Sequence, residues 1–284
     1  MSQKVVTPDL VKELRERTGV GMGKCKEALD QSGGDMEKAI ELLRKAGMAS
    51  AVKKEGRETN EGLIGAAEGT QAVAFVEVNA ETDFVTQNET FKQFLRDIAQ
   101  DAADAQLHEL DALMQHPYSK DASVTLDQHR ALVVQSLGEN IRVKRVLILP
   151  KSSEISIGTY SHMGGKIVTA VILNGGAGQE ALARDIAMHV AAEAPEYLSS
   201  EDVPQAVRAK EEEIALSQIK GKPEDIAHKI VQGKYKAFCD EVCLLCQKYV
   251  KDNTLTISGL LEKESKRLGK NLTISAYYRW KVGV

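Results

Sequence analysis

Two stretches of this sequence carry the same motifs in the same order, and this internal repeat constrains the fold more than any other feature. In the first copy, an apolar segment that ends at Gly65 precedes a glycine turn at residues 68–70. An apolar run over residues 72–79 follows, and then the motif Arg-Asp-Ile-Ala at residues 96–99. About 90 positions later, Gly158, a turn at residues 163–165, a run over residues 166–174 and the same motif at residues 184–187 follow in that order. Short strand pairs with glycine turns predict antiparallel sheets covered by helices on one face. We therefore expect an α+β protein with two related core subdomains, residues 62–150 and 151–284.

The two copies differ in the distance along the sequence between the strand and the helix. This distance is 17 positions in the first copy, from Asn79 to Arg96, and 10 positions in the second, so the first has about seven additional residues. They fall within residues 80–90. Functional side chains favour loops held by rigid elements, so Phe84 beside Asp83 could be inserted into a partner. Equally, Phe84 could belong to a local core while Asp83 caps a helix, and spacing alone does not separate these interpretations.

Residues 7–47 predict three short helices. Thr7 is a suitable N-cap before a proline, and Gly19 ends the first helix. Asp35 begins the third helix, which Gly47 closes. A unit of this size has no room for a buried active site, so we expect residues 1–48 to be a docking domain. The polar residues 49–61 predict a linker.

The second half of the chain predicts a helical hairpin over residues 199–238, with its turn at residues 221–223. A hairpin that projects from a sheet domain commonly supports self-association, and packing on its own domain is the alternative. Residues 101–140 predict mainly helix with a polar break near residues 116–119, before a strand over residues 141–149. Apolar and polar residues alternate over residues 272–282, which predicts a last strand with one buried face.

Two motifs resemble binding sites of other proteins, one a dinucleotide-binding loop and the other a metal site. Residues 176–181 fit Gly-x-Gly-x-x-Ala between a strand and a helix, but a dinucleotide site also needs a second parallel strand ending in an acidic residue about 20 positions on. Here the helical pattern continues instead. Cys239, Cys243 and Cys246 lack a nearby fourth ligand for zinc, and we expect them on the apolar face of a helix. The sequence predicts no catalytic residue, cofactor or metal site, and a nucleotide-binding enzyme that uses the loop at Gly176 is the alternative.

The charge and composition exclude further classes. A net charge of −4 over 284 residues argues against binding nucleic acid through overall charge. No apolar run is long enough to span a bilayer, and the first residues lack the apolar core of a signal peptide. Four cysteines are too few for a disulfide scaffold. We expect a cytoplasmic protein without a membrane or direct nucleic-acid partner.

Four segments resemble the bacterial elongation factor Ts family: residues 13–22, 77–85, 137–141 and 189–192. The most specific is the tetrapeptide Thr82-Asp83-Phe84-Val85, which follows a strand and is preceded by the N-terminal helices. The resemblance runs from about residue 5 to the end of the sequence. It implies a guanine nucleotide exchange factor, with no covalent chemistry, that binds elongation factor Tu and accelerates GDP release in translation elongation.

The resemblance also implies structure and contact residues. It implies that residues 1–48 have a ubiquitin-associated-like (UBA-like) fold and that the hairpin can form a homodimer. Thr82, Asp83, Phe84 and Val85 would disturb the Mg²⁺ and phosphate site of elongation factor Tu. The further partner contacts that it implies are Arg15, Met22, Leu137, Gly138 and His162.

Overall fold

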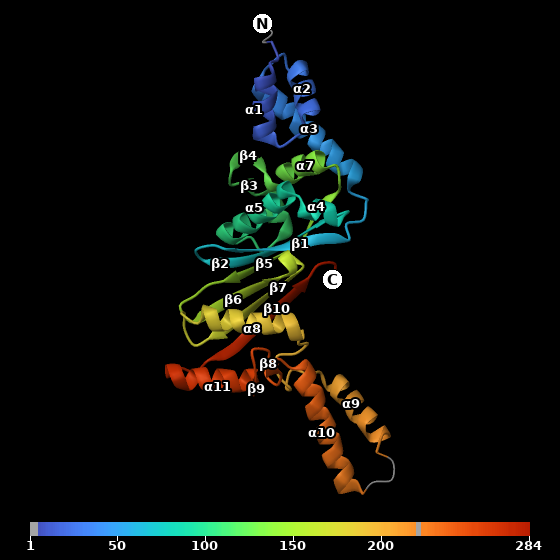
Figure 1. The fold of residues 1–284 in the computed structure, drawn as a ribbon, viewed down its shortest axis with the longest axis vertical. Helices are drawn as coiled ribbons and strands as arrows, with labels where there is room; N and C mark the ends of the chain where they lie inside the picture. The colour runs from blue at the N-terminus through green and yellow to red at the C-terminus, as the bar shows by residue number, and fades with distance from the viewer. Residues whose placement is uncertain (1–4, 220–222) are drawn as a thin grey trace. The chain divides into compact units, whose positions relative to one another are not determined.

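The computed structural model describes residues 5–219 and 223–284, which form an α+β protein (Figure 1). These residues divide into two compact units. Unit 1 contains the chain up to Pro150 together with Met163–Ile167 and Lys281–Val284, and unit 2 contains Lys151–His162 and Val168–Trp280. Each unit has a three-stranded sheet with helices. The expected fold class is confirmed.

Unit 1 begins with three helices, α1 (Pro8–Thr18), α2 (Met22–Gln31) and α3 (Met36–Lys54). The hydroxyl of Thr7 accepts a hydrogen bond from the Leu10 N–H at 3.3 Å, and the carboxylate of Asp35 accepts one from the Lys38 N–H at 3.1 Å. Both predicted N-caps are therefore confirmed. Their buried core includes the side chains Leu14, Cys25, Leu29, Ile40 and Leu43.

The third helix does not end at Gly47, as the sequence had suggested, and it continues to Lys54 through the first residues of the expected linker. Gly47 instead lies where α3 packs closely against α7 (Leu126–Leu137). A Cβ atom at residue 47 would lie 3.2 Å from the carbonyl oxygen of Ala131. The glycine therefore permits the close approach of two helices.

The sheet of unit 1 has the strand order β1-β2-β5, and both pairings are antiparallel. Its strands are β1 (Glu61–Glu68), β2 (Ala72–Ala80) and β5 (Ile141–Pro150). Helix α5 (Glu89–Ala105) lies across β1 and β2 (Figure 1). Phe91 and Phe94 of α5 are buried in the hydrophobic core of this unit, and each contributes roughly 2 kcal/mol to stability by its burial.

The segment between α5 and β5 differs from the expectation that it would be mainly helical. It contains α6 (Leu110–Gln115) and then a small antiparallel hairpin, β3 (Pro117–Tyr118) and β4 (Asp121–Thr125). The polar break near residues 116–119 is therefore the first part of this hairpin. Thr125 then caps α7 in a capping box with Gln128, and β5 follows.

The sheet of unit 2 has the order β10-β7-β6. Its strands are β6 (Ile155–His162), β7 (Ile167–Asn174) and β10 (Thr273–Lys281), and the short 3₁₀ helix η1 (Met163–Gly165) joins the first two. Helix α8 (Glu180–Glu193) packs against β6. The two predicted copies of a strand pair followed by a helix are confirmed, as is the last strand.

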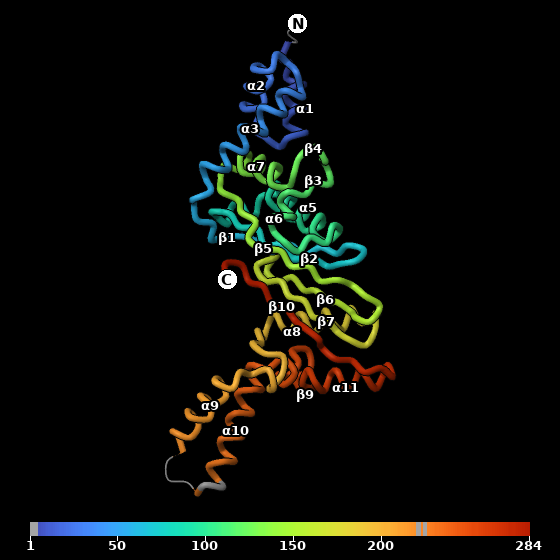
Figure 2. The backbone as a smooth tube through the Cα atoms, turned by 180° about the vertical axis from the view of Figure 1, so that it is seen from behind, coloured from blue at the N-terminus to red at the C-terminus, as the bar shows by residue number. Residues whose placement is uncertain are grey.

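Helices α9 (Gln205–Ser217) and α10 (Glu224–Val242) pack against each other as the predicted hairpin. They lie side by side in both views (Figures 1 and 2). The expected turn at residues 221–223 lies mostly outside the described residues. After the hairpin come β8 (Lys248–Tyr249), β9 (Asp252–Thr256) and α11 (Ile257–Leu268).

The repeat extends further than the sequence had suggested. Each unit follows its strand pair and helix with a two-stranded hairpin, a helix capped by threonine and a third strand. The first strand of each hairpin ends with a tyrosine, Tyr118 in unit 1 and Tyr249 in unit 2, and each tyrosine is followed two residues later by lysine and then aspartate. The chain thus uses one folding pattern twice.

Candidate functional site

The additional residues of the first copy form a short helical turn, α4 (Asp83–Gln87), between β2 and α5. In unit 2 the loop that joins β7 to α8 contains no such helix. Thr82 is the N-cap of α4, because its hydroxyl accepts a hydrogen bond from the Val85 N–H at 3.4 Å. Asn88 caps α5 directly afterwards. We call residues 82–87 the projecting turn.

The side chains of the projecting turn face in two directions. Val85 and Thr86 are buried, with 9% and 0% of their surface exposed, whereas Phe84 is 85% exposed. The interpretation of Phe84 as a local core residue is therefore wrong. Asp83 is also exposed and is not the cap, since Thr82 has that role. Asp83 stands in the first turn of α4, where a carboxylate is favourable.

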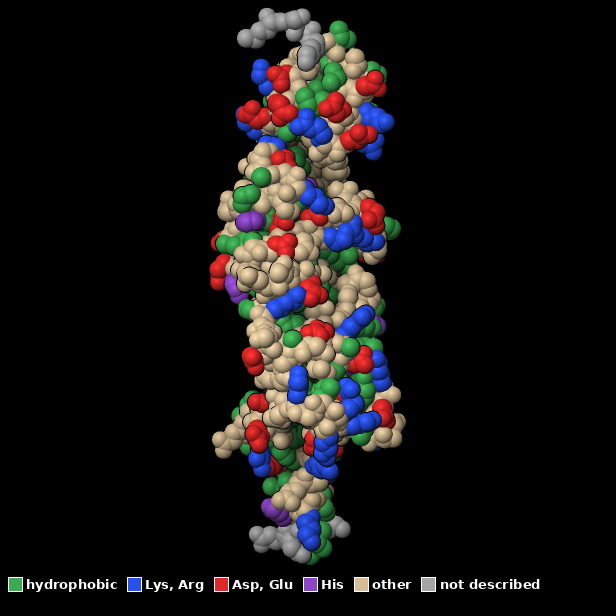
Figure 3. Space-filling model, turned by 90° about the vertical axis from the view of Figure 1, so that its left-hand side faces the viewer, with side chains coloured by type: hydrophobic (Ala, Val, Ile, Leu, Met, Phe, Trp, Pro, Cys, Tyr) green, Lys and Arg blue, Asp and Glu red, His purple; other side chains and the backbone are tan. Residues whose placement is uncertain are grey.

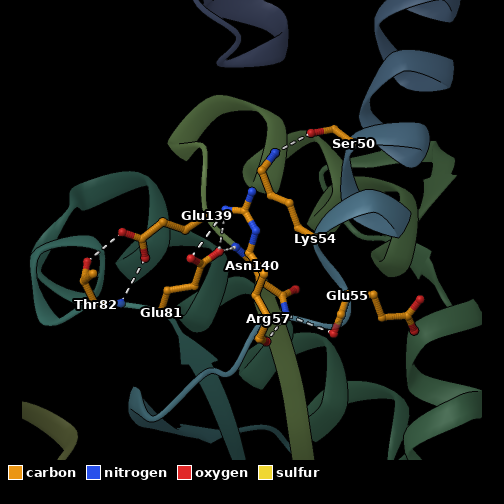
Figure 4. A network of polar contacts seen from close by, with 8 residues as sticks. All are labelled: Ser50, Lys54, Glu55, Arg57, Glu81, Thr82, Glu139 and Asn140. Atoms are coloured by element: carbon orange, nitrogen blue, oxygen red, sulfur yellow. Dashed lines mark hydrogen bonds and ion pairs between the residues drawn. The ribbon is translucent and has the colours of Figure 1, made fainter.

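A carboxylate from another part of unit 1 holds the projecting turn (Figure 4). Glu139 follows the end of α7, and its two carboxylate oxygens accept hydrogen bonds from Thr82. The backbone N–H donates at 3.0 Å and the hydroxyl at 2.7 Å. The hydroxyl of Thr82 thus links the carboxylate to the first turn of α4.

Glu81 precedes Thr82 in the sequence and is held as well (Figure 4). Its carboxylate accepts a hydrogen bond from the Asn140 N–H at 2.6 Å and forms an ion pair with Arg57 at 3.3 Å. The Asn140 side chain, itself buried, donates to the carbonyl oxygens of Glu55 and Arg57 at 3.3 and 2.9 Å. The segment after α3 is therefore fastened to the start of the projecting turn.

Positive charge also lies close to this network. Lys54 donates to the hydroxyl of Ser50 at 2.6 Å. Its burial, together with the nearby positive charge of Arg57, lowers the pKa of Lys54 below its usual range. On the face of the molecule drawn in Figure 3, basic and acidic side chains are interspersed.

The expected contact residues at the end of α7 lie beside the projecting turn. Gly138 is the C-cap of α7, with a φ of 82° that favours glycine. It is exposed, and Leu137 before it is half-buried against the core. The hydrogen bonds between Glu139 and Thr82 bring these two segments together, although they are 57 residues apart in sequence.

The other expected contact residues lie elsewhere. Arg15 on α1 and Met22 on α2 are exposed, Met22 by 42%. His162 ends β6 in unit 2, where it is exposed and its ring stacks against that of Tyr160 with centroids 6.1 Å apart. Of these expected contact residues, Leu137 and Gly138 are the ones placed next to Thr82, through the hydrogen bonds of the adjacent Glu139.

Sequence reasoning missed the residues that hold the projecting turn. Glu139 and Asn140 are adjacent to the expected contacts, and Arg57 lies in the expected linker. A single acidic residue after a helix-ending glycine gives no sign of a partner far away in the sequence. Only the fold brings Glu139 to Thr82.

The loop at Gly176 has no free backbone donors for a phosphate group. The N–H groups of Gly175 and Gly176 donate to the Glu154 carbonyl oxygen, and that of Ala177 donates to Ser153. Those of Gly178 and Gln179 donate to side chains. The chain continues after α8 into α9 and α10, so the parallel strand of a dinucleotide fold does not follow.

The three clustered cysteines belong to the packing beside the hairpin. Cys239 and Cys243 are buried with Val203 in an apolar cluster, and Cys246 packs against it. They do not share a helix face as expected, because α10 ends at Val242. Burial raises the pKa of Cys243 to about 12, so its thiol stays protonated and binds metal poorly. Within residues 5–219 and 223–284, no three His, Cys, Asp or Glu side chains are grouped to hold a metal ion.

No helix among the described residues is both long enough and apolar enough to cross a membrane.

Comparisons with known proteins agree on one family. The family model described as Elongation factor TS matches residues 81–284. A protein of Protochlamydia amoebophila (strain UWE25) named Elongation factor Ts is 59% identical over 278 residues, which cover 98% of this chain and 99% of the relative. Proteins of the same name from Chlamydia trachomatis serovar L2 and Chlamydia felis are 45% and 46% identical over 275 residues, covering 97% of this chain and 98% of each relative.

Proposed function

This chain belongs to the elongation factor Ts family, and on that premise we propose that it is a guanine nucleotide exchange factor for elongation factor Tu. It binds this GTPase, disturbs its Mg²⁺ and phosphate site and accelerates GDP release during translation elongation. The observation that carries the proposal is the 85% exposure of Phe84 on a turn whose start is held by hydrogen bonds and whose Val85 and Thr86 are buried.

An exposed phenylalanine is suited to burial in a partner. Burying such a side chain contributes roughly 2 kcal/mol, and this fold leaves that contribution unused. Aromatic side chains on rigid supports commonly dominate binding at protein interfaces. Val85 and Thr86 anchor the same turn in the core, so Phe84 pays little ordering entropy on binding.

The chemistry follows from what holds GDP in a GTPase. Backbone N–H groups of the phosphate loop and a bridging Mg²⁺ bind the phosphates. Phe84 inserts between helices of the partner and shifts the elements on the Mg²⁺ side. Asp83 brings negative charge and acceptor oxygens to the same region, which weakens the hold on the phosphates. The chain forms and breaks no covalent bond in this process.

Linkage limits what the factor can do. The exchange factor lowers the affinity of the GTPase for GDP, and bound GDP lowers its affinity for the exchange factor by the same ratio. It therefore binds most tightly to the nucleotide-free GTPase. It changes the rate of exchange and leaves the overall equilibrium between bound GDP and GTP unchanged.

Other residues make further contacts with the GTPase. Leu137 and Gly138 contribute beside the projecting turn, Arg15 and Met22 contribute from the N-terminal helices, and His162 makes a separate contact from unit 2. We place the protein in the cytoplasm, where translation occurs. The isolated chain binds no nucleotide, which separates this proposal from an enzyme that uses the loop at Gly176.

We also propose that the hairpin of α9 and α10 supports a homodimer. Three of its large apolar side chains, Ile214, Leu216 and Ile226, are 42%, 56% and 43% exposed. Analytical ultracentrifugation of the wild type and of Leu216→Lys tests this proposal. A dimer that the substitution dissociates supports it, and a wild-type monomer at high concentration contradicts it.

The exchange activity is tested by the release of a fluorescent GDP analogue from elongation factor Tu. We expect strong acceleration by the wild type, near-complete loss with Phe84→Ala, and wild-type activity for Val250→Ala, which changes an apolar residue that is 46% exposed in unit 2. Acceleration that survives Phe84→Ala would move the mechanism away from the projecting turn. A folded wild type that gives no acceleration contradicts the function, and nucleotide binding by the isolated chain would then favour the enzyme.

A further inference from the structure

Glu139 makes an unusual pair of contacts for a half-exposed carboxylate. Both of its oxygens accept hydrogen bonds from the same residue, Thr82, at 3.0 and 2.7 Å. Because the hydroxyl of Thr82 donates its proton to Glu139, its lone pairs stay available to accept the Val85 N–H. The carboxylate therefore fixes both the position of Thr82 and the direction of its hydroxyl.

The projecting turn needs such support. Helix α4 has five residues, and a helix of this length is not stable alone in water. Val85 and Thr86 anchor its far side by burial. Its start, directly before Asp83 and Phe84, is held by polar contacts of Thr82 and Glu81.

The support for Glu139 is itself well defined. The left-handed conformation of Gly138 turns the chain sharply at the end of α7, and the next residue is Glu139. On its other side, Asn140 is buried and makes three hydrogen bonds, to Glu81, Glu55 and Arg57. Glu139 is therefore placed from both neighbours before it meets Thr82 (Figure 4).

We propose that Glu139 is a positioning residue for nucleotide exchange, which acts by holding Thr82 so that Phe84 and Asp83 are presented in one geometry. This inference rests on the proposed exchange function. Glu139 need not touch the GTPase, since its effect passes through the projecting turn. Small errors in such placement are costly, because a displacement of about 1 Å can lower a rate about 100-fold.

The first test uses the free chain and needs no partner. Glu139→Gln keeps the size of the side chain but removes the charge and one acceptor oxygen. We expect the backbone amides of residues 82–86 to exchange with deuterium about 10-fold faster, with little change in the melting temperature. Glu109→Gln is the matched control, because Glu109 is exposed in unit 1 and its side chain caps nothing. Unchanged protection of residues 82–86 in Glu139→Gln would overturn the proposal.

The second test separates positioning from direct contact with the GTPase. With saturating factor, we expect Glu139→Gln to release GDP about 10-fold more slowly, while the half-saturating concentration changes less than about 3-fold. The same substitution is then made in a Phe84→Leu background, which retains a measurable rate. If Glu139 acts through Phe84, its effect in this background is clearly smaller than in the wild type. Fully additive effects would show an independent role and overturn the proposal.

The two proposals can fail separately. A wild type that does not accelerate GDP release contradicts the exchange function and, with it, the role of Glu139 in exchange. If the wild type and Glu139→Gln accelerate GDP release equally, only the positioning role is contradicted.

Discussion

The hydroxyl of Tyr118 donates a 2.7 Å hydrogen bond to a carboxylate oxygen of Asp97, which is only 6% exposed. The second copy of the repeat makes the equivalent contact between Tyr249 and Asp185, at 3.4 Å. In each unit the lysine two residues after the tyrosine also pairs with this aspartate, at 2.6 and 2.7 Å. Both units thus fasten a short hairpin to the helix on the sheet through the same polar contacts.

The first prediction compares the two tyrosines. Removing the hydroxyl with Tyr118→Phe leaves a buried carboxylate with one donor fewer, so we expect a loss of about 1–2 kcal/mol in unfolding free energy. Tyr249→Phe should cost less than about 0.5 kcal/mol, since its bond is long and Asp185 is partly exposed. Urea unfolding of both variants measures the difference. Equal losses would contradict the distinction between a buried and an exposed partner.

This repeat also shows how far the sequence could predict the fold. The strand pairs and their helices were readable because their motifs are local and similarly spaced. The tyrosine contacts were not, since 21 positions separate Asp97 from Tyr118, whereas 64 separate Asp185 from Tyr249. The hairpin of α9 and α10 accounts for most of that difference. An insertion between two partners removes the common spacing that would have revealed them.

The candidate site, too, could be predicted only in part from the sequence. The segment 80–90 could be singled out because an insertion in one copy of a repeat is visible in the sequence, whereas the choice of residues 82–85 within it came from the family resemblance. Whether Phe84 is buried or exposed could not be predicted, since a five-residue turn has too few positions to establish a periodicity. The contact with Glu139 depends on where α7 ends in space, and no local pattern contains that information.

The second prediction concerns the glycines at matching positions of the two first strands. A Cβ at residue 158 would lie 2.0 Å from the backbone nitrogen of Arg184, so β6 and α8 would have to move apart. A Cβ at residue 65 would lie 3.0 Å from the side chain of Leu95 and 3.2 Å from its carbonyl oxygen, so a shift of a few tenths of an ångström would relieve both contacts. We expect Gly158→Ala to cost about 3 kcal/mol or more and Gly65→Ala about 1 kcal/mol.

The chain's single tryptophan makes the first of these costs measurable. Trp280 lies in β10 of unit 2, so its fluorescence during urea unfolding reports the unit that contains Gly158. Circular dichroism reports the helices of both units. If Gly158→Ala left the fluorescence midpoint unchanged, the close packing of α8 on β6 would be wrong.

The third prediction concerns a buried ion pair. Glu77 on β2 is fully buried, and one of its oxygens lies 2.7 Å from the guanidinium of Arg145 on β5, whose side chain is 32% exposed. The other oxygen accepts the Gly283 N–H at 3.3 Å and lies 3.7 Å from the ammonium group of Lys144. The two partners are therefore unequal, because Arg145 can reach water and Glu77 cannot.

We expect Arg145→Met to destabilise the chain by about 3 kcal/mol, since the buried carboxylate loses its nearest partner and keeps only the longer contact with Lys144. Glu77→Gln should cost clearly less, because the cation that remains can be solvated. Thermal unfolding of the two variants gives the order. A larger loss for Glu77→Gln would contradict the argument from burial.

The fourth prediction concerns two histidines, the buried His189 and the half-buried His129. His189 Nδ1 accepts the Val250 N–H at 3.2 Å, so this nitrogen carries no proton, and Nε2–H donates to Gln247 at 3.0 Å. His129 stacks on Tyr118 with ring centroids 4.2 Å apart. Burial lowers the pKa of both residues below the usual value. For His129 it outweighs the nearby negative charge of Asp97.

The sign of the pH dependence follows from these shifts. As the pH falls through about 6.5, the histidines of the unfolded chain bind protons while His129 and His189 in the folded chain do not. The unfolding free energy therefore decreases with falling pH, by up to about 1.4 kcal/mol per pH unit for each histidine until its folded pKa is reached. Urea midpoints at pH 7, 6 and 5 measure this slope. His129→Gln combined with His189→Gln should lower the stability at pH 7 but flatten the slope between pH 6.5 and 5. A slope as steep as that of the wild type would show that other groups cause the acid sensitivity.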